Sequence, residues 1–94
     1  MNRVELIFSQ ALEEDFIEAF RRNLIQKFTE LPAVRGQGIS TPKLGDEIWP
    51  QLNAMMIVYC SDDDEAKIEK IVADMRKKYV TEGIACFVSK AHER

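Results

Sequence analysis

A chain of 94 residues predicts one domain, spanning 1–94, and a hydrophobic content of 46% is enough for a packed core. The net charge of −3 argues against binding to nucleic acid, which needs a basic surface. No apolar run is long enough to span a bilayer, so we expect no membrane insertion, and the absence of a signal-peptide pattern favours the cytoplasm. Cys60 and Cys86 are expected to be free, buried thiols of a reducing compartment.

The chain opens with a predicted strand and a predicted helix. Residues Arg3–Ser9 alternate between apolar and mostly polar positions, which is typical of a strand with one buried face. Residues Ala11–Leu24 carry an apolar side chain at every fourth position, which predicts a helix that packs on a sheet and is capped near Ser9 or Gln10. The apolar stripe of this helix consists of Leu12, Phe16, Phe20 and Leu24.

Two further strands are predicted in the middle of the chain. The first, Lys27–Arg35, contains Pro32, which cannot donate a hydrogen bond to a neighbouring strand, so this strand should lie at an edge or carry a bulge. The second, Ala54–Cys60, is continuously apolar, as in strands that are buried on both faces. Helices would cover one face of such a sheet, so we expect another copy of the protein to cover the other.

The last part of the chain predicts a helix over Ser61–Lys78 and a strand over Ile84–Ser89. Asp62 fits a helix cap, followed by Glu65 three positions later, and this explains the acidic run 62–65 more simply than a metal cluster does. The apolar stripe of this helix consists of Ile68, Ile71, Val72, Met75 and Tyr79.

The order of these elements is strand, helix, strand, strand, helix, strand. With right-handed crossovers, this order predicts an α+β fold, the ferredoxin-like βαββαβ sandwich, in which two helices cover one face of an antiparallel four-stranded sheet. The first and third strands should lie inside the sheet, and the strand with Pro32 should lie at its edge.

A long connection, residues 36–53, separates the second and third strands. It holds three of the four glycines and the only tryptophan, and structureless connections of this length are usually functional or mobile. Its two glycines at 36 and 38 would let backbone N–H groups approach an anion, and two basic side chains nearby would supply charge to a phosphate or carboxylate. The predicted ligand site is therefore Arg35, Gly36, Gln37, Gly38 and Lys43. The alternative is a strand end that needs glycine for a positive φ.

The same connection also carries candidate contacts to another protein. Trp49 would anchor a partner, with Leu44 beside it, because tryptophan is enriched at the centres of interfaces. The alternatives are that Trp49 folds back on its own domain or packs on a neighbouring subunit.

Several stretches, taken in order, resemble the PII-like family, the relatives of the nitrogen-regulatory PII signalling proteins. Val34-Arg35-Gly36-Gln37-Gly38 closes the second strand before a long loop, and Asp64-Glu65-Ala66-Lys67-Ile68 opens the second helix. Glu82-Gly83, followed by Phe87-Val88-Ser89, completes a resemblance that covers nearly the full length of the chain.

The resemblance implies a PII-like homotrimer whose sheets face the three-fold centre, which would cover the second face of Ala54–Cys60. It also implies a non-enzymatic signalling protein that binds a small effector, often an adenine nucleotide, in clefts between subunits. The loop after the second strand would contact a partner such as a transporter or an enzyme. No cofactor is identified.

The sequence departs from the family pattern close to the expected ligand site. Ile39 and Ser40 stand where the family has charged and amide residues, and Ile84 and Ala85 replace a lysine that follows the glycine of the last strand. The backbone around Gly36 therefore remains the main expected ligand group, together with the two basic side chains of the predicted site.

Two other classes of function stay open on the sequence. A metal-responsive protein would use Cys60 or His92 as a ligand, since trimeric ferredoxin-like relatives are linked to metal tolerance. A small enzyme at a subunit interface would use Asp46 or Glu47 as its base. We predict a protein that is not an enzyme, because no nucleophile has a recognisable base near it and the only histidine is His92.

Overall fold

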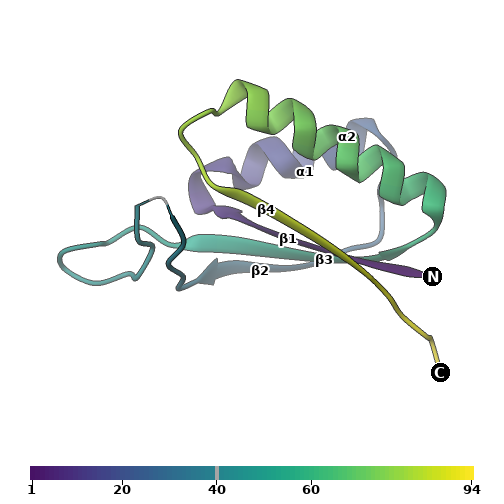
Figure 1. Cartoon of the computed structure of the whole chain (residues 1–94), viewed down its shortest axis with the longest axis horizontal. Helices are drawn as coiled ribbons and strands as arrows, with labels where there is room; N and C mark the ends of the chain where they lie inside the picture. Colours follow the sequence, from purple (N-terminus) through teal and green to yellow (C-terminus); the bar gives the residue numbers. More distant parts are fainter. Residues whose placement is uncertain (40) are drawn as a thin grey trace.

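The computed structural model describes residues 1–39 and 41–94 and has two layers, a sheet with two helices on one of its faces (Figure 1). The elements are β1 (Asn2–Ser9), the short 3-10 helix η1 (Gln10–Leu12), α1 (Glu13–Arg22), β2 (Thr29–Val34), β3 (Asn53–Cys60), α2 (Asp62–Lys78) and β4 (Ile84–Lys90). The strand order is β2-β3-β1-β4, with every neighbouring pair antiparallel. The predicted ferredoxin-like fold is therefore confirmed, with β1 and β3 inside the sheet.

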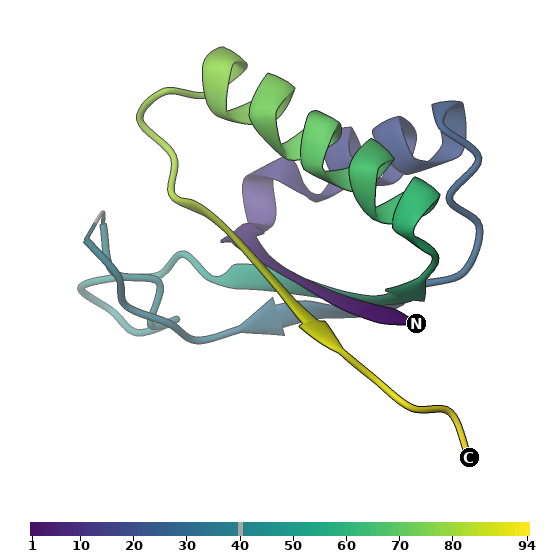
Figure 2. The same cartoon turned by 45° about the vertical axis from the view of Figure 1, so that its right-hand side comes forward.

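The core lies between the sheet and the two helices, which run side by side above it (Figure 2). In β1, the alternating residues Val4, Leu6 and Phe8 are fully buried beneath the helices. The ring of Phe8 stacks on the ring of Phe16 of α1, with ring centroids 4.1 Å apart. Each fully buried apolar side chain of this kind contributes about 1.5–3 kcal/mol. Packing on the sheet, more than intrinsic helix preference, therefore holds the helices in place.

The predicted helix stripe is right except at its end. Ser9 caps the start, since its Oγ accepts a hydrogen bond from the N–H of Ala11. Leu24 is wrongly placed in the stripe, because α1 ends at Arg22 and Leu24 has a left-handed backbone (φ 59°) that turns its side chain outward, 70% exposed. The next residue, Ile25, enters the core instead.

The cap of α2 is one residue earlier than predicted. The Oγ of Ser61 accepts a hydrogen bond from the N–H of Asp64, whereas Asp62 accepts a hydrogen bond from the side-chain amide of Asn2 at 2.6 Å. Asn2 is fully buried, and its amide oxygen accepts a hydrogen bond from Nζ of Lys90. This network joins β1, α2 and β4, so the Asp62 carboxylate has a structural role other than the predicted cap.

The strand β2 confirms the interpretation of Pro32. It pairs only with β3 and so lies at an edge of the sheet, and its register shifts between Leu31 and Val34. The proline therefore stands where the ladder of hydrogen bonds is already interrupted.

Next to this irregularity, β2 places a carboxylate on the helix side of the sheet. Glu30 lies opposite the buried Met56, and its Oε2 is buried with no hydrogen-bond partner among residues 1–39 and 41–94. Burial raises the pKa of Glu30, and the nearby Glu13 carboxylate raises it further. A buried, unsatisfied carboxylate oxygen makes the ionised form of Glu30 unfavourable in the folded protein.

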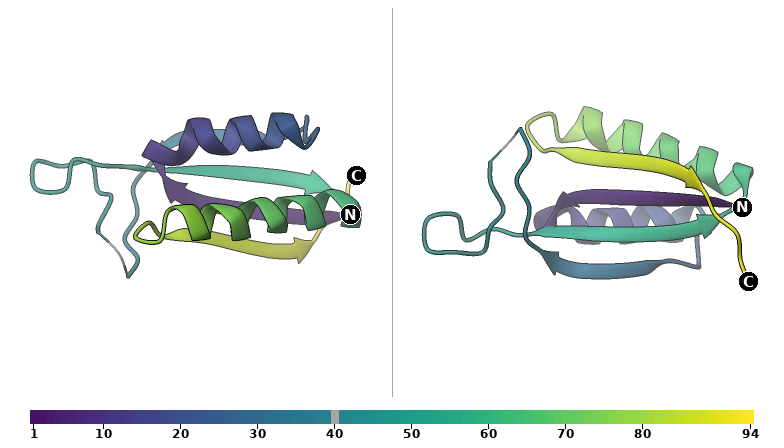
Figure 3. Two further views of the ribbon diagram at one scale, coloured as in Figure 1. Left: turned by 90° about the horizontal axis from the view of Figure 1, so that it is seen from above. Right: turned by 60° about the horizontal axis from the view of Figure 1, so that its bottom comes forward.

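The face of the sheet away from the helices, which we call the open face, is not covered by any of the described helices or strands (Figure 3, right). In β3, residues alternate between complete burial under the helices and partial exposure on the open face, where Tyr59 is 52% exposed. The predicted burial of β3 on both faces is therefore not reached within one chain, because none of the described elements packs on this side. Exposed apolar side chains from three strands share the open face: Leu31, Tyr59 and Phe87.

Candidate functional site

The long connection extends beyond the end of the sheet, on the side away from both termini (Figure 1). Its residue Ser40 lies outside the described residues. Gly36 and Lys43 pair as an antiparallel bridge, with two backbone hydrogen bonds of 2.8 Å. Farther out, the carboxylate of Asp46 accepts hydrogen bonds from the N–H groups of Ile48 and Trp49. The sequence suggested a structureless connection. The structure differs, because local hydrogen bonds shape two turns within it.

A cleft of about 530 Å³ lies at the base of this connection, and we call it the loop cleft. All the predicted ligand residues line it: Arg35, Gly36, Gln37, Gly38 and Lys43. Its other side is formed by the start of β4, residues 83–85, and Ile7 and Met55 line it from the open face. The loop after β2 reaches across the end of the sheet toward this wall (Figure 3). The structure thus brings the predicted residues together, and their role in binding stays a prediction.

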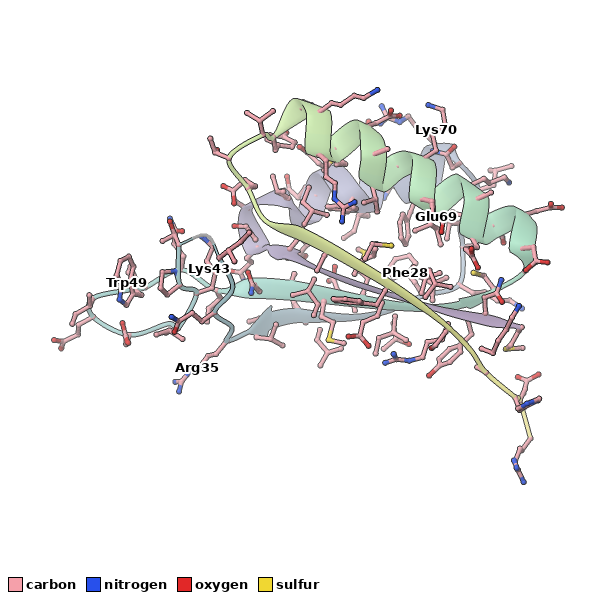
Figure 4. All side chains as sticks on the ribbon, in the orientation of Figure 1. Phe28, Arg35, Lys43, Trp49, Glu69 and Lys70 are labelled. Atoms are coloured by element: carbon pink, nitrogen blue, oxygen red, sulfur yellow. The ribbon has the colours of Figure 1, made fainter. Side chains whose placement is uncertain are left out.

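Lys43 supplies the most unusual electrostatic feature of the loop cleft (Figure 4). The residue is only 7% exposed, and its Nζ donates a hydrogen bond of 2.8 Å to Oε1 of Gln51. None of the ion pairs among the described residues involves Lys43, so the partner of this buried ammonium is a neutral amide. A buried charge without a counter-ion is costly, and a bound anion would relieve that cost.

A positive φ does not explain Gly36 and Gly38, which excludes the alternative of a strand end that needs glycine for its backbone conformation. Among the described glycines, only Gly45 has a positive φ. At Gly36, a Cβ atom would lie 2.7 Å from Nδ2 of Asn53, so the missing side chain permits close packing. At Gly38, a Cβ atom would meet nothing within 4 Å. No contact with the described residues, 1–39 and 41–94, therefore requires glycine at position 38, which lines the cleft.

The outer part of the connection exposes apolar side chains. Ile48 is 78% exposed and Trp49 is 40% exposed, whereas Leu44 is half-buried. The side chain of Trp49 lies at the outer end of the connection (Figure 4). Trp49 is therefore only partly packed on its own chain, which leaves one side for another protein.

The residues of the two alternative functions do not gather into a site. Among residues 1–39 and 41–94, no group of three His, Cys, Asp or Glu side chains could hold a metal ion. Cys60 and Cys86 are free thiols, but they are only partly buried, so the prediction that they are buried is wrong. This partial burial raises the pKa of both, and for Cys60 the nearby Asp64 carboxylate raises it further. The Asp46 carboxylate is engaged in the turn described above, and Glu47 is exposed.

Sequence reasoning missed the residues that support the predicted site. Gln51 holds the Lys43 ammonium, and Asn53 packs against Gly36, although both lie near the end of the loop among other polar residues. No sequence signal distinguishes them, because each acts through a contact within the loop. For the wall at 83–85, the sequence offered one indication, the glycine that precedes the last strand.

Comparisons with known proteins identify the fold. No protein-family model and no curated protein matches the chain. Among solved structures, it is similar to a PII-like signalling protein from Thermus thermophilus, with 17% identity, a TM-score of 0.65, and coverage of 94% of this chain and 83% of that one. It is also similar to CPII, a nitrogen regulatory PII-like protein from Thiomonas intermedia, in a structure bound to ADP, AMP and bicarbonate. That match has 16% identity, a TM-score of 0.70, and coverage of 94% and 82%.

These matches define the class of fold to which the chain belongs. The protein has the PII-like fold, which confirms the resemblance seen in the sequence at the level of fold. The structure of CPII without ligand is also similar, with 10% identity, a TM-score of 0.57, and coverage of 94% of this chain and 87% of that one. Among the described residues, no helix is both long enough and apolar enough to cross a membrane.

Proposed function

We propose that this protein is a non-enzymatic, cytoplasmic regulatory protein of the PII-like type, which acts as a homotrimer. It binds a small anionic effector in the loop cleft and contacts a partner, such as a transporter or an enzyme, through the loop at 36–53. The observation that carries the proposal is Lys43, a residue only 7% exposed that lines the cleft and has no carboxylate partner among residues 1–39 and 41–94.

The charge of the loop cleft selects the chemical class of the effector. Lys43 has three N–H donors, and the structure gives one of them to Gln51. The exposed residue Arg35 lines the same cleft, although Figure 4 shows its side chain pointing away from Lys43. The open backbone at Gly38 leaves room for a ligand to approach main-chain N–H groups. Together these groups favour a phosphate or a carboxylate, including bicarbonate.

The similarity to CPII supports the same choice of effectors. CPII has been solved with ADP, AMP and bicarbonate. All three are anions, so they suit a cleft with an uncompensated ammonium, and they are the first compounds to test here. The free thiols Cys60 and Cys86 agree with a reducing compartment such as the cytoplasm.

The open face supports assembly into a trimer. Its apolar side chains come from three strands, and exposed apolar patches of this kind mark interaction surfaces. The loop cleft is lined by Ile7 and Met55 of the same face, so a second copy packed there would lie next to a bound effector. Effector binding and assembly would thus share one region of the molecule.

The exposed end of the loop supports contact with a partner. Ile48 and Trp49 form an apolar pair that the chain itself does not bury. Aromatic residues at protruding positions are frequent anchors in protein interfaces. The turn held by Asp46 presents these side chains in a defined geometry.

Two measurements test the proposal. Isothermal titration calorimetry with ADP, AMP, bicarbonate and phosphate should detect binding of at least one anion, with uncharged adenosine as the control. Analytical ultracentrifugation should show a trimer. Absence of binding by all four anions would reject the effector cleft, and a stable monomer would reject the assembly.

A further inference from the structure

We infer that Arg76 is a positioning residue for the loop cleft, because it fixes the wall at residues 83–85 from the opposite side of the sheet. This inference rests on the proposed function, since it assigns a role in effector binding. It concerns a residue of α2 that does not itself line the cleft.

The contact is a forked hydrogen bond from one side chain to one carbonyl group. The Nε and Nη2 atoms of Arg76 both donate to the backbone oxygen of Ile84, at 3.1 and 2.7 Å. Hydrogen bonds from a charged donor are stronger than neutral ones, and the planar guanidinium fixes their direction. The last turn of α2 is thereby tied to the first residue of β4.

Two residues of the wall have other attachments: Ile84 and Ala85 are paired with β1, and the side chain of Ile84 is buried in the core. β4 is an edge strand, and Ile84 is paired with Phe8 close to the end of β1. Before it, the connection from α2 carries a single backbone turn, in which Glu82 donates to the carbonyl of Tyr79. Gly83 lies outside this pairing, so we expect the carbonyl that Arg76 holds to help to fix its position.

Arg76 acts on the cleft only through this backbone. Burial raises the pKa of the Cys86 thiol, and the nearby Arg76 guanidinium partly opposes this rise. Cys86 lies opposite the buried Leu6, so the guanidinium is on the helix side of β4, whereas the cleft opens on the other side. Loss of the guanidinium should therefore alter the shape of the cleft without removing a group that touches the effector.

The test compares Arg76→Met and Arg76→Lys with Arg22→Met. Methionine keeps the unbranched stem and loses the donors, and lysine keeps the charge with a simpler donor. Arg22 is the matched control, because it lies in the last turn of α1 and, in the part of the chain that the structure describes, makes only an exposed ion pair of 3.9 Å with Glu18. Each protein is measured by amide hydrogen exchange without ligand and by calorimetric titration with ADP and with bicarbonate.

We expect faster exchange at residues 83–85 in Arg76→Met, relative to β3 amides that report global unfolding. We also expect about tenfold weaker binding, because the loosened wall must be ordered when the effector binds. Arg76→Lys should recover part of both effects, and Arg22→Met should show neither. If Arg76→Met does not fold, the lysine variant gives the same two readouts with smaller changes.

Unchanged affinity in Arg76→Met would overturn the inference, even if exchange at the wall became faster. Equal losses in Arg22→Met would also overturn it, because the effect would then be general to the helices. If the wild type binds neither probe, the proposed function has failed for these anions. The exchange data alone then decide whether Arg76 fixes the wall, and unchanged exchange rejects that too.

Discussion

Replacing Lys43 by methionine distinguishes two roles for this lysine, binding of an anion and stabilisation of the fold. The methionine side chain keeps an unbranched, flexible stem of similar length and fits the same apolar surroundings. The change removes the ammonium of a residue that is only 7% exposed, together with its hydrogen bond to Gln51. The oxygen that is left on Gln51 belongs to an exposed residue, so water can replace the lost donor.

The effect on stability follows from two opposing terms. A hydrogen bond from a charged group contributes about 1.5–3 kcal/mol, and its loss destabilises the variant. The cost of burying an ammonium is several kcal/mol, and its removal stabilises the variant. We therefore expect Lys43→Met to unfold with an unchanged free energy or one about 1 kcal/mol higher. A gain of that size would raise the Tm by about 4–8 °C in a domain of this length.

The effect on binding has the opposite sign. A contact between the ammonium and an anionic effector is a charge-assisted hydrogen bond, again about 1.5–3 kcal/mol. Its loss should weaken binding of ADP or bicarbonate by about 10- to 150-fold. The protein would thus become as stable or more stable while losing its ligand.

Thermal and urea unfolding give the stability, and calorimetric titration gives the affinity. Lys70→Met serves as the control, because Lys70 is exposed on α2 and its one ion pair with a described residue is with Asp74. An affinity equal to that of the wild type would refute the reasoning. So would a loss of more than about 2 kcal/mol in stability, since that would show that the ammonium is needed by the fold.

Three further predictions follow from other contacts. Glu30→Gln should stabilise the protein by about 1 kcal/mol near pH 8 and have little effect near pH 4, as urea unfolding across pH can check. The reason is that folding raises the pKa of Glu30, so the stability associated with its protonated form is present below the unfolded pKa and is lost as pH rises through the folded pKa. Gly38→Ala should weaken anion binding and leave the Tm unchanged or higher. Gly36→Ala should lower the Tm, because its Cβ would meet Asn53. If only Gly36→Ala weakens binding, the proposed role of position 38 is wrong. Phe87→Glu should sediment as a folded monomer, since Phe87 is exposed on the open face; a trimer that survives this change would place the interface elsewhere.

Most of the fold could be predicted because its signals are local. Pro32 indicated an edge strand, since a missing N–H has the same consequence in any sheet, and the alternation in β1 indicated which residues enter the core. The errors arose where neighbouring elements compete for a residue. Leu24 fits the helical period, but the helix ends before it. Asp62 fits a helix cap, but its carboxylate accepts a hydrogen bond from the buried Asn2 instead.

The residues that line the candidate site could be predicted from the sequence, but the hydrogen bonds that hold them in place could not. Glycines and basic residues in a loop are visible in sequence, and the structure places all of those predicted along one cleft. The hydrogen bonds from Lys43 to Gln51 and from Arg76 to Ile84 each span eight residues and depend on tertiary structure. Sequence spacing carries no signal for such contacts, because many other polar residues have the same spacing.

The two sides of the loop cleft belong to opposite borders of the sheet. One side follows β2 and the other begins β4, while the central strands β3 and β1 run between them. A molecule that contacts both sides would connect the two edges of the sheet, and its affinity would change when the twist of the sheet changes. Because linkage is reciprocal, a protein that binds the open face and changes the twist of the sheet would also change the affinity of the cleft for its ligand.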